Sequence, residues 1–207
     1  MTKTHKLHKS SLCIFALCMI ASLLTACGKR GQEEFEKGNA AYYKDKDYDL
    51  AVKYYTEAVE KGNTDAMVQL GMCYYDGKGV KEDKKETVKW VRKAADKGNA
   101  HAMYMLGELY YSGKGVETDK KEAVRWIRKS AKKGNPEAML RLSTMYHKAD
   151  GVEGDDKEAF KWARKAAEKG DTAAMVSLST FYRYGLGVEK DEKEAEKWAR
   201  KAKEYYD

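Results

Sequence analysis

Residues 64–99 read TDAMVQLGMCYYDGKGVKEDKKETVKWVRKAADKGN, and the pattern of this stretch returns every 36 residues through the rest of the chain. The interval divides residues 64–207 into four units, which begin at residues 64, 100, 136 and 172. Each unit holds one tryptophan at the same place, and these are Trp90, Trp126, Trp162 and Trp198. A fixed period with several agreeing positions is typical of a repeat architecture, in which each unit packs on its neighbours.

Each unit is predicted to form two helices joined by a glycine-rich loop. In the first unit, the apolar residues of each half recur at a period of 3.6, and the sequence DGKGV at 76–80 lies between the halves. Asp83 and Glu86 have the D-x-x-E spacing of a capping box, so the second helix should begin there. Gly98 can take the left-handed conformation that ends a helix, and Asn99 is a favourable N-cap for the next one.

The two ends of the array are expected to differ from its middle. Residues 33–63 form a shorter fifth unit that lacks the glycine loop. In the last unit, Glu196 and Lys203 replace apolar residues of the second helix, so this helix face should meet water as a cap. The tryptophans of the four long units are expected to supply the bulk of the core.

The motif A-M-x-x-L-G-x-x-Y-x-x-G-x-G-V at residues 66–80 resembles the Sel-one-like repeat, an extended-loop relative of the tetratricopeptide repeat. A second motif of that family, K-x-x-x-W-x-x-K-A-A, matches residues 86–95 except at its first letter. The resemblance covers residues 33–207, with 33–63 closer to an ordinary tetratricopeptide repeat. It implies an all-α fold, a right-handed α-solenoid of helix-turn-helix repeats. It also implies a protein-binding scaffold. The residues offer no convincing acid/base pair or metal site, so we expect no enzymatic activity and no cofactor.

The N-terminus has the layout of an export signal. Lys3, Lys6 and Lys9 precede an uninterrupted run of apolar and small residues at 12–24. A permanent membrane span needs ~20 apolar residues, and this run is shorter. A cleaved signal peptide is therefore favoured over a transmembrane anchor.

The run ends in Leu-Thr-Ala-Cys at residues 24–27, which resembles the lipobox of bacterial lipoproteins. That resemblance implies removal of residues 1–26, lipidation of Cys27, and a short linker at 27–32. Several acyl chains on one residue would hold the protein at a membrane. Gly28 stands where an aspartate would favour the inner membrane, so we expect an envelope protein on the outer membrane, either periplasmic or surface-exposed. An ordinary secretory signal with an incidental cysteine is the alternative.

Charge and reactive residues point away from several function classes. The chain has a net charge of +7, and loss of three lysines with residues 1–26 lowers it to +4. The basic residues alternate with acids, which predicts a solvated helix face and no nucleic-acid partner. His101 and His147 are too few to suggest a metal site. Cys73 falls in an apolar column and is interpreted as a buried thiol, and the S-x-x-K match at 130–133 is attributed to chance.

A partner surface is predicted by carrying over the groove-facing positions of tetratricopeptide repeats. The first column is apolar throughout and consists of Val68, Tyr104, Leu140 and Val176. The second column is aromatic and basic and consists of Tyr75, Tyr111, His147 and Arg183. Packing between neighbouring first helices is an open alternative for the first column. The second column, whose residue types are favoured interface anchors, is expected to be accessible.

The resulting hypothesis is a membrane-anchored protein-protein interaction scaffold of the bacterial cell envelope. Its role could be envelope assembly, binding of a host factor, or immunity against a toxin, and the sequence leaves the partner protein unidentified. The competing hypotheses are a hydrolase acting on cell-wall or β-lactam substrates, and a glycan-binding protein that uses the same groove.

Overall fold

The computed structural model describes residues 31–205, so the export signal and Cys27 lie outside the described residues. The described chain is helical throughout and holds no strand. None of its helices is both long enough and apolar enough to cross a membrane.

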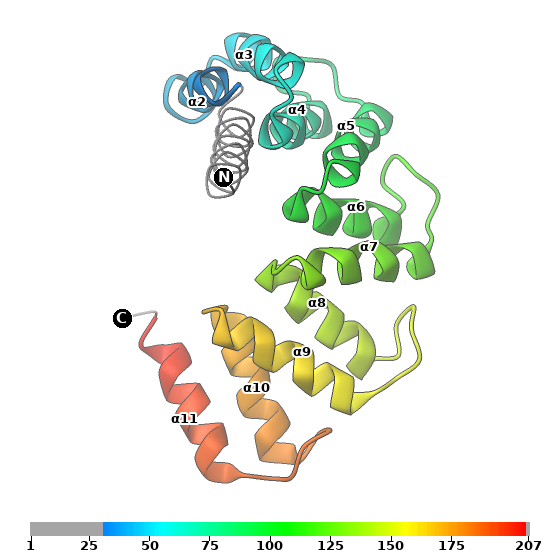
Figure 1. Cartoon of the computed structure of the whole chain (residues 1–207), viewed down its shortest axis with the longest axis vertical. Coiled ribbons are helices and arrows are strands. Elements are labelled where there is room, and N and C mark those ends of the chain that lie inside the picture. Colours follow the sequence, from blue (N-terminus) through cyan, green and yellow to red (C-terminus); the bar gives the residue numbers. More distant parts are fainter. Residues whose placement is uncertain (1–30, 206–207) are drawn as a thin grey trace, which may run out of the picture.

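The helices follow one another in five pairs. Their bounds are α2 Gln32–Asn39 with the π-helical turn η1 Ala40–Asp45, α3 Tyr48–Glu60, α4 Thr64–Asp76, α5 Lys84–Asp96, α6 Ala100–Ser112, α7 Lys120–Lys132, α8 Pro136–His147, α9 Asp156–Glu168, α10 Thr172–Tyr184 and α11 Glu192–Lys203. Every helix from α3 onward packs against the helix before it and the helix after it, where there is one. The pairs follow an arc, with α2 near one end and α11 at the other (Figure 1). The predicted all-α solenoid of helical repeats is therefore confirmed.

The second helix of each long unit begins directly after its aspartate, as predicted. The side chain of Asp83 accepts the backbone N–H groups of Lys85 and Glu86 at 2.8 and 3.0 Å. The reciprocal half of the capping box does not form, because the N–H of Asp83 donates instead to the carbonyl of Tyr74 at 2.9 Å. The Glu86 carboxylate pairs with Lys89 at 2.8 Å. The aspartate thus closes the loop onto the first helix as well as capping the second.

The boundaries between units also follow the prediction. In every unit before the last, the glycine that follows the second helix has a positive φ, at Gly62, Gly98, Gly134 and Gly170. The next residue caps the following first helix with its side-chain oxygen, at Asn63, Asn99, Asn135 and Asp171. Since glycine takes this conformation without a Cβ penalty and Asn or Asp satisfies free N–H groups, each turn is specified by local chemistry.

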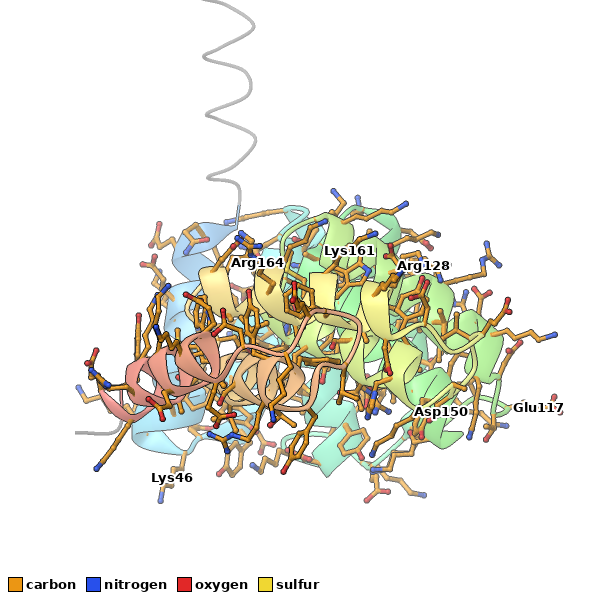
Figure 2. All side chains as sticks on the ribbon, turned by 90° about the horizontal axis from the view of Figure 1, so that it is seen from below. Lys46, Glu117, Arg128, Asp150, Lys161 and Arg164 are labelled. Carbon is orange, nitrogen blue, oxygen red and sulfur yellow. The ribbon has the colours of Figure 1, made fainter. Side chains whose placement is uncertain are left out.

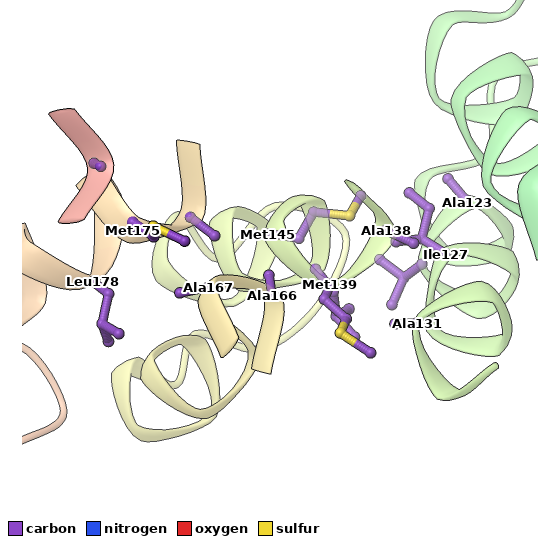
Figure 3. Close-up of a cluster of buried hydrophobic side chains, with 14 residues drawn as sticks. Ala123, Ile127, Ala131, Ala138, Met139, Met145, Ala166, Ala167, Met175 and Leu178 are labelled. Atoms are coloured by element: carbon purple, nitrogen blue, oxygen red, sulfur yellow. The ribbon is translucent and has the colours of Figure 1, made fainter. Parts of the chain in front are cut away.

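Small and medium apolar side chains fill the core, and this corrects the expectation for the tryptophans. Ile127, Met145 and Leu178 are fully buried, and a cluster that contains them runs from α7 to α11 (Figure 3). Trp126 is buried with 6% exposure. The other three tryptophans are half-buried at the edge of the core, namely Trp90, Trp162 and Trp198.

The glycine that precedes the loop valine lets each loop rest on the preceding unit. A Cβ placed on Gly115 would collide with the backbone carbonyl of Lys84, the first residue of α5. Gly79, Gly151 and Gly187 approach the first residues of α3, α7 and α9 in the same way. The loops therefore contribute contacts between units in addition to joining helices within one unit.

The last unit is a cap, as predicted. Of α11 only Ala195 and Ala202 are buried, whereas Glu196 and Lys203 are exposed. Charged residues at these positions meet water because no sixth unit covers α11 among the described residues.

Candidate functional site

The first helices of successive units enclose a row of hollows. The largest, about 700 Å³, lies between η1, α4 and α6, and a second of about 380 Å³ lies between α4 and α6. Met72 and Met105 line both, so the two form one continuous groove, which we call the tyrosine groove. A third hollow of about 250 Å³ lies between α8 and α10. Concave surfaces with apolar walls and a few polar groups are the usual form of a binding site.

Three residues of the first predicted column line these hollows, and the fourth packs against the core. Val68 lines the largest hollow but is 4% exposed, so most of its side chain packs between first helices. Tyr104 lines the second hollow, and burial raises the pKa of its hydroxyl. Val176 lines the third and is 52% exposed. Leu140 is half-buried against the core cluster and lines none of the three.

The tyrosines of the second column are half-buried and already partnered, which corrects the expectation that they stand free. Tyr75 lines the second hollow, and its hydroxyl accepts a hydrogen bond from Lys114 Nζ at 2.5 Å. Lys84 Nζ lies 3.9 Å from the centre of the Tyr75 ring. Because Lys114 belongs to the loop of the next unit, this contact joins two units.

Tyr111 makes the equivalent contact with the next loop, but its partner there is an aspartate where Tyr75 has a lysine. Its hydroxyl donates to Asp150 of the next loop at 2.6 Å, and Lys120 donates to the same carboxylate at 2.8 Å. The Arg141 guanidinium lies 4.3 Å from the Tyr111 ring centre and pairs with Glu108 at 2.8 Å. The hydrogen bonds from Lys120 and Tyr111 hold the pKa of Asp150 below its ordinary value. The network is a structural bridge between units.

The last two members of the column bond within their own units. His147 Nδ1 lies 2.6 Å from Asp156 Oδ1, and its ring meets Phe181 edge-on at 5.7 Å. Arg183 donates to Glu192 at 3.3 Å and lines none of the three hollows. The four positions therefore share a place in the fold, but only Tyr75 and His147 line a hollow.

A tyrosine cluster in the shorter unit at residues 33–63 is the part of the site that sequence reasoning missed. Tyr42 packs edge-on against Tyr43 and Tyr48, with ring centres 4.7 and 5.1 Å apart. Lys78 donates to the Tyr42 hydroxyl at 3.0 Å, and this bond raises the pKa of Lys78. Tyr43 is 62% exposed at the groove. Four tyrosines between residues 42 and 54 were the available signal, but this unit lacks the 36-residue pattern that aligned the others.

The residues weighed for chemistry occupy structural positions. Ser130 is fully buried, and its hydroxyl donates to the carbonyl of Ala100 at 2.6 Å, which leaves no path for a substrate. Cys73 is fully buried, and burial raises the pKa of its thiol to about 11. His101 lies at the surface, and within residues 31–205 no cluster of potential metal ligands occurs.

Two solved structures are similar to the chain in both sequence and fold. It is 33% identical to c5321, a protective antigen present in uropathogenic Escherichia coli strains that displays an SLR fold, with a TM-score of 0.79 over 86% of this chain and 38% of c5321. It is 35% identical to a Sel1 repeat protein from Oxalobacter formigenes, with a TM-score of 0.77 over 84% of this chain and 70% of that protein. The chain thus spans little more than a third of the length of c5321.

A more distant match shares the fold alone. The immunity protein PA5088 from Pseudomonas aeruginosa is 22% identical, with a TM-score of 0.59 over 84% of this chain and 64% of that protein. A search among curated proteins found no match. Sel1 repeat proteins are protein-interaction scaffolds, and their fold is generally not enzymatic. Since the Sel1 repeat pattern matches residues 26–63, 64–99, 100–135, 136–171 and 172–204, the chain belongs to the Sel1 repeat family.

Proposed function

We propose that this chain is a protein-interaction scaffold of the bacterial cell envelope, held at a membrane by lipid on Cys27, and that it binds a segment of its partner in the tyrosine groove. The observation that carries the binding part is the continuity of the groove from η1 to α6 through the shared Met72 and Met105. Flexible methionines and exposed tyrosine suit a protein surface, because both offer large contact area.

The groove also explains which predicted residues would contact a partner directly. Tyr75 and Tyr104 line it, so they remain candidate anchors. Tyr111 would act mainly by holding two units in register, because its hydroxyl bonds to the next loop. Tyr43 and Met72 join the candidates because they lie in the largest hollow. A partner that presents one aromatic or aliphatic side chain to this hollow would bury apolar surface on both sides.

Affinity capture from envelope extracts, with the mature chain as bait, tests the binding part. Tyr43→Ala should weaken capture of the main partner by about 30-fold or more, because removal of an anchor at a hot spot typically costs about 2 kcal/mol or more. Tyr184→Ala is the matched control, since Tyr184 is 69% exposed but lines none of the three hollows. Equal capture by wild type and Tyr43→Ala would place the partner surface elsewhere.

The anchoring part has a separate test. Cells fed an alkyne fatty acid should tag the wild-type protein and leave Cys27→Ser untagged, and density-gradient fractionation should then place the wild type with the outer membrane. Absence of a tag on the wild type would refute lipidation and leave the groove hypothesis intact. The captured partner would distinguish envelope assembly, host-factor binding and toxin immunity.

Recovery of peptidoglycan in place of a protein would favour the glycan-binding alternative. Tyrosine rings are suited to stacking on sugars as well as to protein contacts, so the same Tyr43→Ala comparison applies to a sacculus pull-down.

A further inference from the structure

The second helices carry rows of positive charge that the repeat interval keeps in line. In α7, Lys121, Arg125 and Arg128 stand at positions i, i+4 and i+7, which lie on one face of a helix. The same three positions hold lysine or arginine in α5, α9 and α11 as well. We call the residues at these positions the basic face. The alternation with acids along the sequence hides it. Some acids share the face, since Glu168 lies four residues after Arg164 and pairs with it at 2.8 Å.

The helices are segregated by charge. Together α5, α7, α9 and α11 hold 20 Lys and Arg against 9 Asp and Glu. The first helices α4, α6, α8 and α10 hold 2 against 4. Positive charge therefore gathers on the layer of second helices, whereas the layer that lines the hollows is nearly neutral.

Much of this charge has no carboxylate beside it. Arg125 pairs with Glu122 at 2.6 Å, and the equivalent residues of the other units pair in the same way. Lys121 and Lys157, in contrast, form no ion pair with any carboxylate of residues 31–205. Arg128 donates to the neutral hydroxyl of Tyr146 at 2.9 Å, which orients the guanidinium without neutralising it. The basic face can therefore attract an anionic surface.

The basic face lies on the side of the molecule where the described chain begins. Arg128, Lys161 and Arg164 lie along one edge in Figure 2, and the start of α2 lies at that same edge. Lys46, which lines the tyrosine groove, lies at the opposite edge (Figure 2). Three residues lie between Cys27 and Gly31, and an extended chain covers at most about 3.6 Å per residue, so these four steps put Cys27 at most about 14 Å from Gly31.

We propose that the basic face lies against anionic phospholipid headgroups and turns the tyrosine groove away from the membrane. This inference rests on the proposed lipid anchor, because the short linker makes a bilayer the nearest extended anionic surface. Electrostatic attraction acts over about 8–10 Å at physiological salt, a distance that such a linker allows. One acylated residue would fix only a point, and the basic face would fix the orientation of the array.

The test uses the mature chain with Cys27→Ser, which has no lipid anchor. Its affinity for vesicles measures what the basic face contributes to membrane binding. Vesicles with 30% phosphatidylglycerol should bind the protein in a salt-dependent way, and pure phosphatidylcholine should not. Lys121→Gln combined with Lys157→Gln should weaken binding by about 25-fold, since each lysine near an anionic bilayer contributes about fivefold. Both side chains are exposed and unpaired, so melting should be unchanged.

The matched control is Lys46→Gln combined with Lys148→Gln, which removes the same net charge from residues that line the hollows. It should alter binding by no more than about twofold, because these lysines line the hollows and do not belong to the basic face. Equal loss in the two double variants would show that only net charge matters and would overturn the proposal.

Two further outcomes would also overturn it. One is the absence of binding to phosphatidylglycerol vesicles, and the other is tighter binding to duplex DNA than to the vesicles at the same salt concentration. Because Cys27 is replaced throughout, failure here is distinguishable from failure of the lipid anchor, which the fatty-acid label reports by itself.

Discussion

The second helices α7 and α11 occupy equivalent places in their units, yet one is inside the array and the other closes it. In α7, six residues are buried, among them Trp126 and Ile127, whereas in α11 only Ala195 and Ala202 are. The helices have the same local signals, an aspartate cap and a tryptophan at the seventh position. The difference shows that burial in a solenoid depends on the number of neighbours, and the effect of a substitution should therefore depend on the unit that carries it.

Truncation of the tryptophan column should give the largest contrast. Trp126→Ala should lower the free energy of unfolding by about 3–5 kcal/mol, because the buried ring would leave a cavity and its cation–π contact with Lys129 at 3.9 Å would be lost. Trp198→Ala should cost clearly less, because that ring is only half-buried. Urea denaturation followed by circular dichroism measures both. Equal losses would mean that position in the array does not matter.

Glycine replacement should give the next largest contrast. Gly115→Ala should cost about 2–4 kcal/mol, because φ is +75° and a Cβ would collide with the backbone of the preceding unit. Gly170→Ala, near the last unit, should cost only about 1–2 kcal/mol for its positive φ, since the nearest atom to its added Cβ is the Tyr205 hydroxyl at 3.8 Å. Thermal melting of the two variants checks the order. A smaller loss for Gly115→Ala would mean that its loop moves freely away from α5.

The bridge at Tyr111 should show a moderate contrast with Arg183. Tyr111→Phe keeps the ring and removes the hydrogen bond to the ionised Asp150, so it should cost about 1.5 kcal/mol. Arg183→Gln, at the corresponding place in the last unit, breaks only an exposed pair with Glu192 and should cost less than about 0.5 kcal/mol. Urea titrations at pH 7 measure both changes.

Acid should reduce the effect of Tyr111→Phe. The pKa of Asp150 is lower in the folded protein than its ordinary value, so its ionised form stabilises the fold above about pH 4, and this stabilisation is lost as pH falls through the folded pKa. Tyr111 is one cause of the lowered pKa, so the stability gap between wild type and Tyr111→Phe should narrow below about pH 4. A constant gap from pH 7 to pH 3 would contradict the role assigned to the hydrogen bond.

Loss of an exposed ion pair should have the smallest effect on stability, and the effect should be the same in the last unit and in an interior unit. Lys197→Gln in α11 and Lys89→Gln in α5 each break a pair with a glutamate three residues earlier, at 2.7 and 2.8 Å. Both should cost less than about 0.5 kcal/mol, because solvent screens exposed pairs wherever they lie in the array. A large loss at Lys89 alone would show that interior units also strengthen their surface contacts.

The sequence predicted the helix boundaries well because short-range chemistry sets them. Asp83, Gly98 and Asn99 act on backbone groups a few residues away, so their roles could be inferred without knowledge of the fold. The capping box was only half right. The N–H of Asp83 could be satisfied either by Glu86 or by a carbonyl of the first helix, and the loop geometry selected Tyr74.

The candidate site was predicted less completely, since it depends on which units meet. The column of Tyr75 and Tyr111 was found from the repeat, but the partners that half-bury these rings, Lys114 and Asp150, come from the loop of the next unit. The tyrosines of the shorter unit at residues 33–63 were missed because that unit has a π-helical turn and no glycine loop. Both features break its alignment with the other units.

The sequence by itself determined the repeat, its helices and its caps, because a 36-residue interval and local hydrogen bonds need no information from distant residues. The tertiary structure decided which tryptophan is buried, which tyrosines bridge units, and how the lysines of separate helices join into one basic face. Those properties arise only when the units stack, since stacking removes water from some faces of otherwise similar helices and leaves it on others.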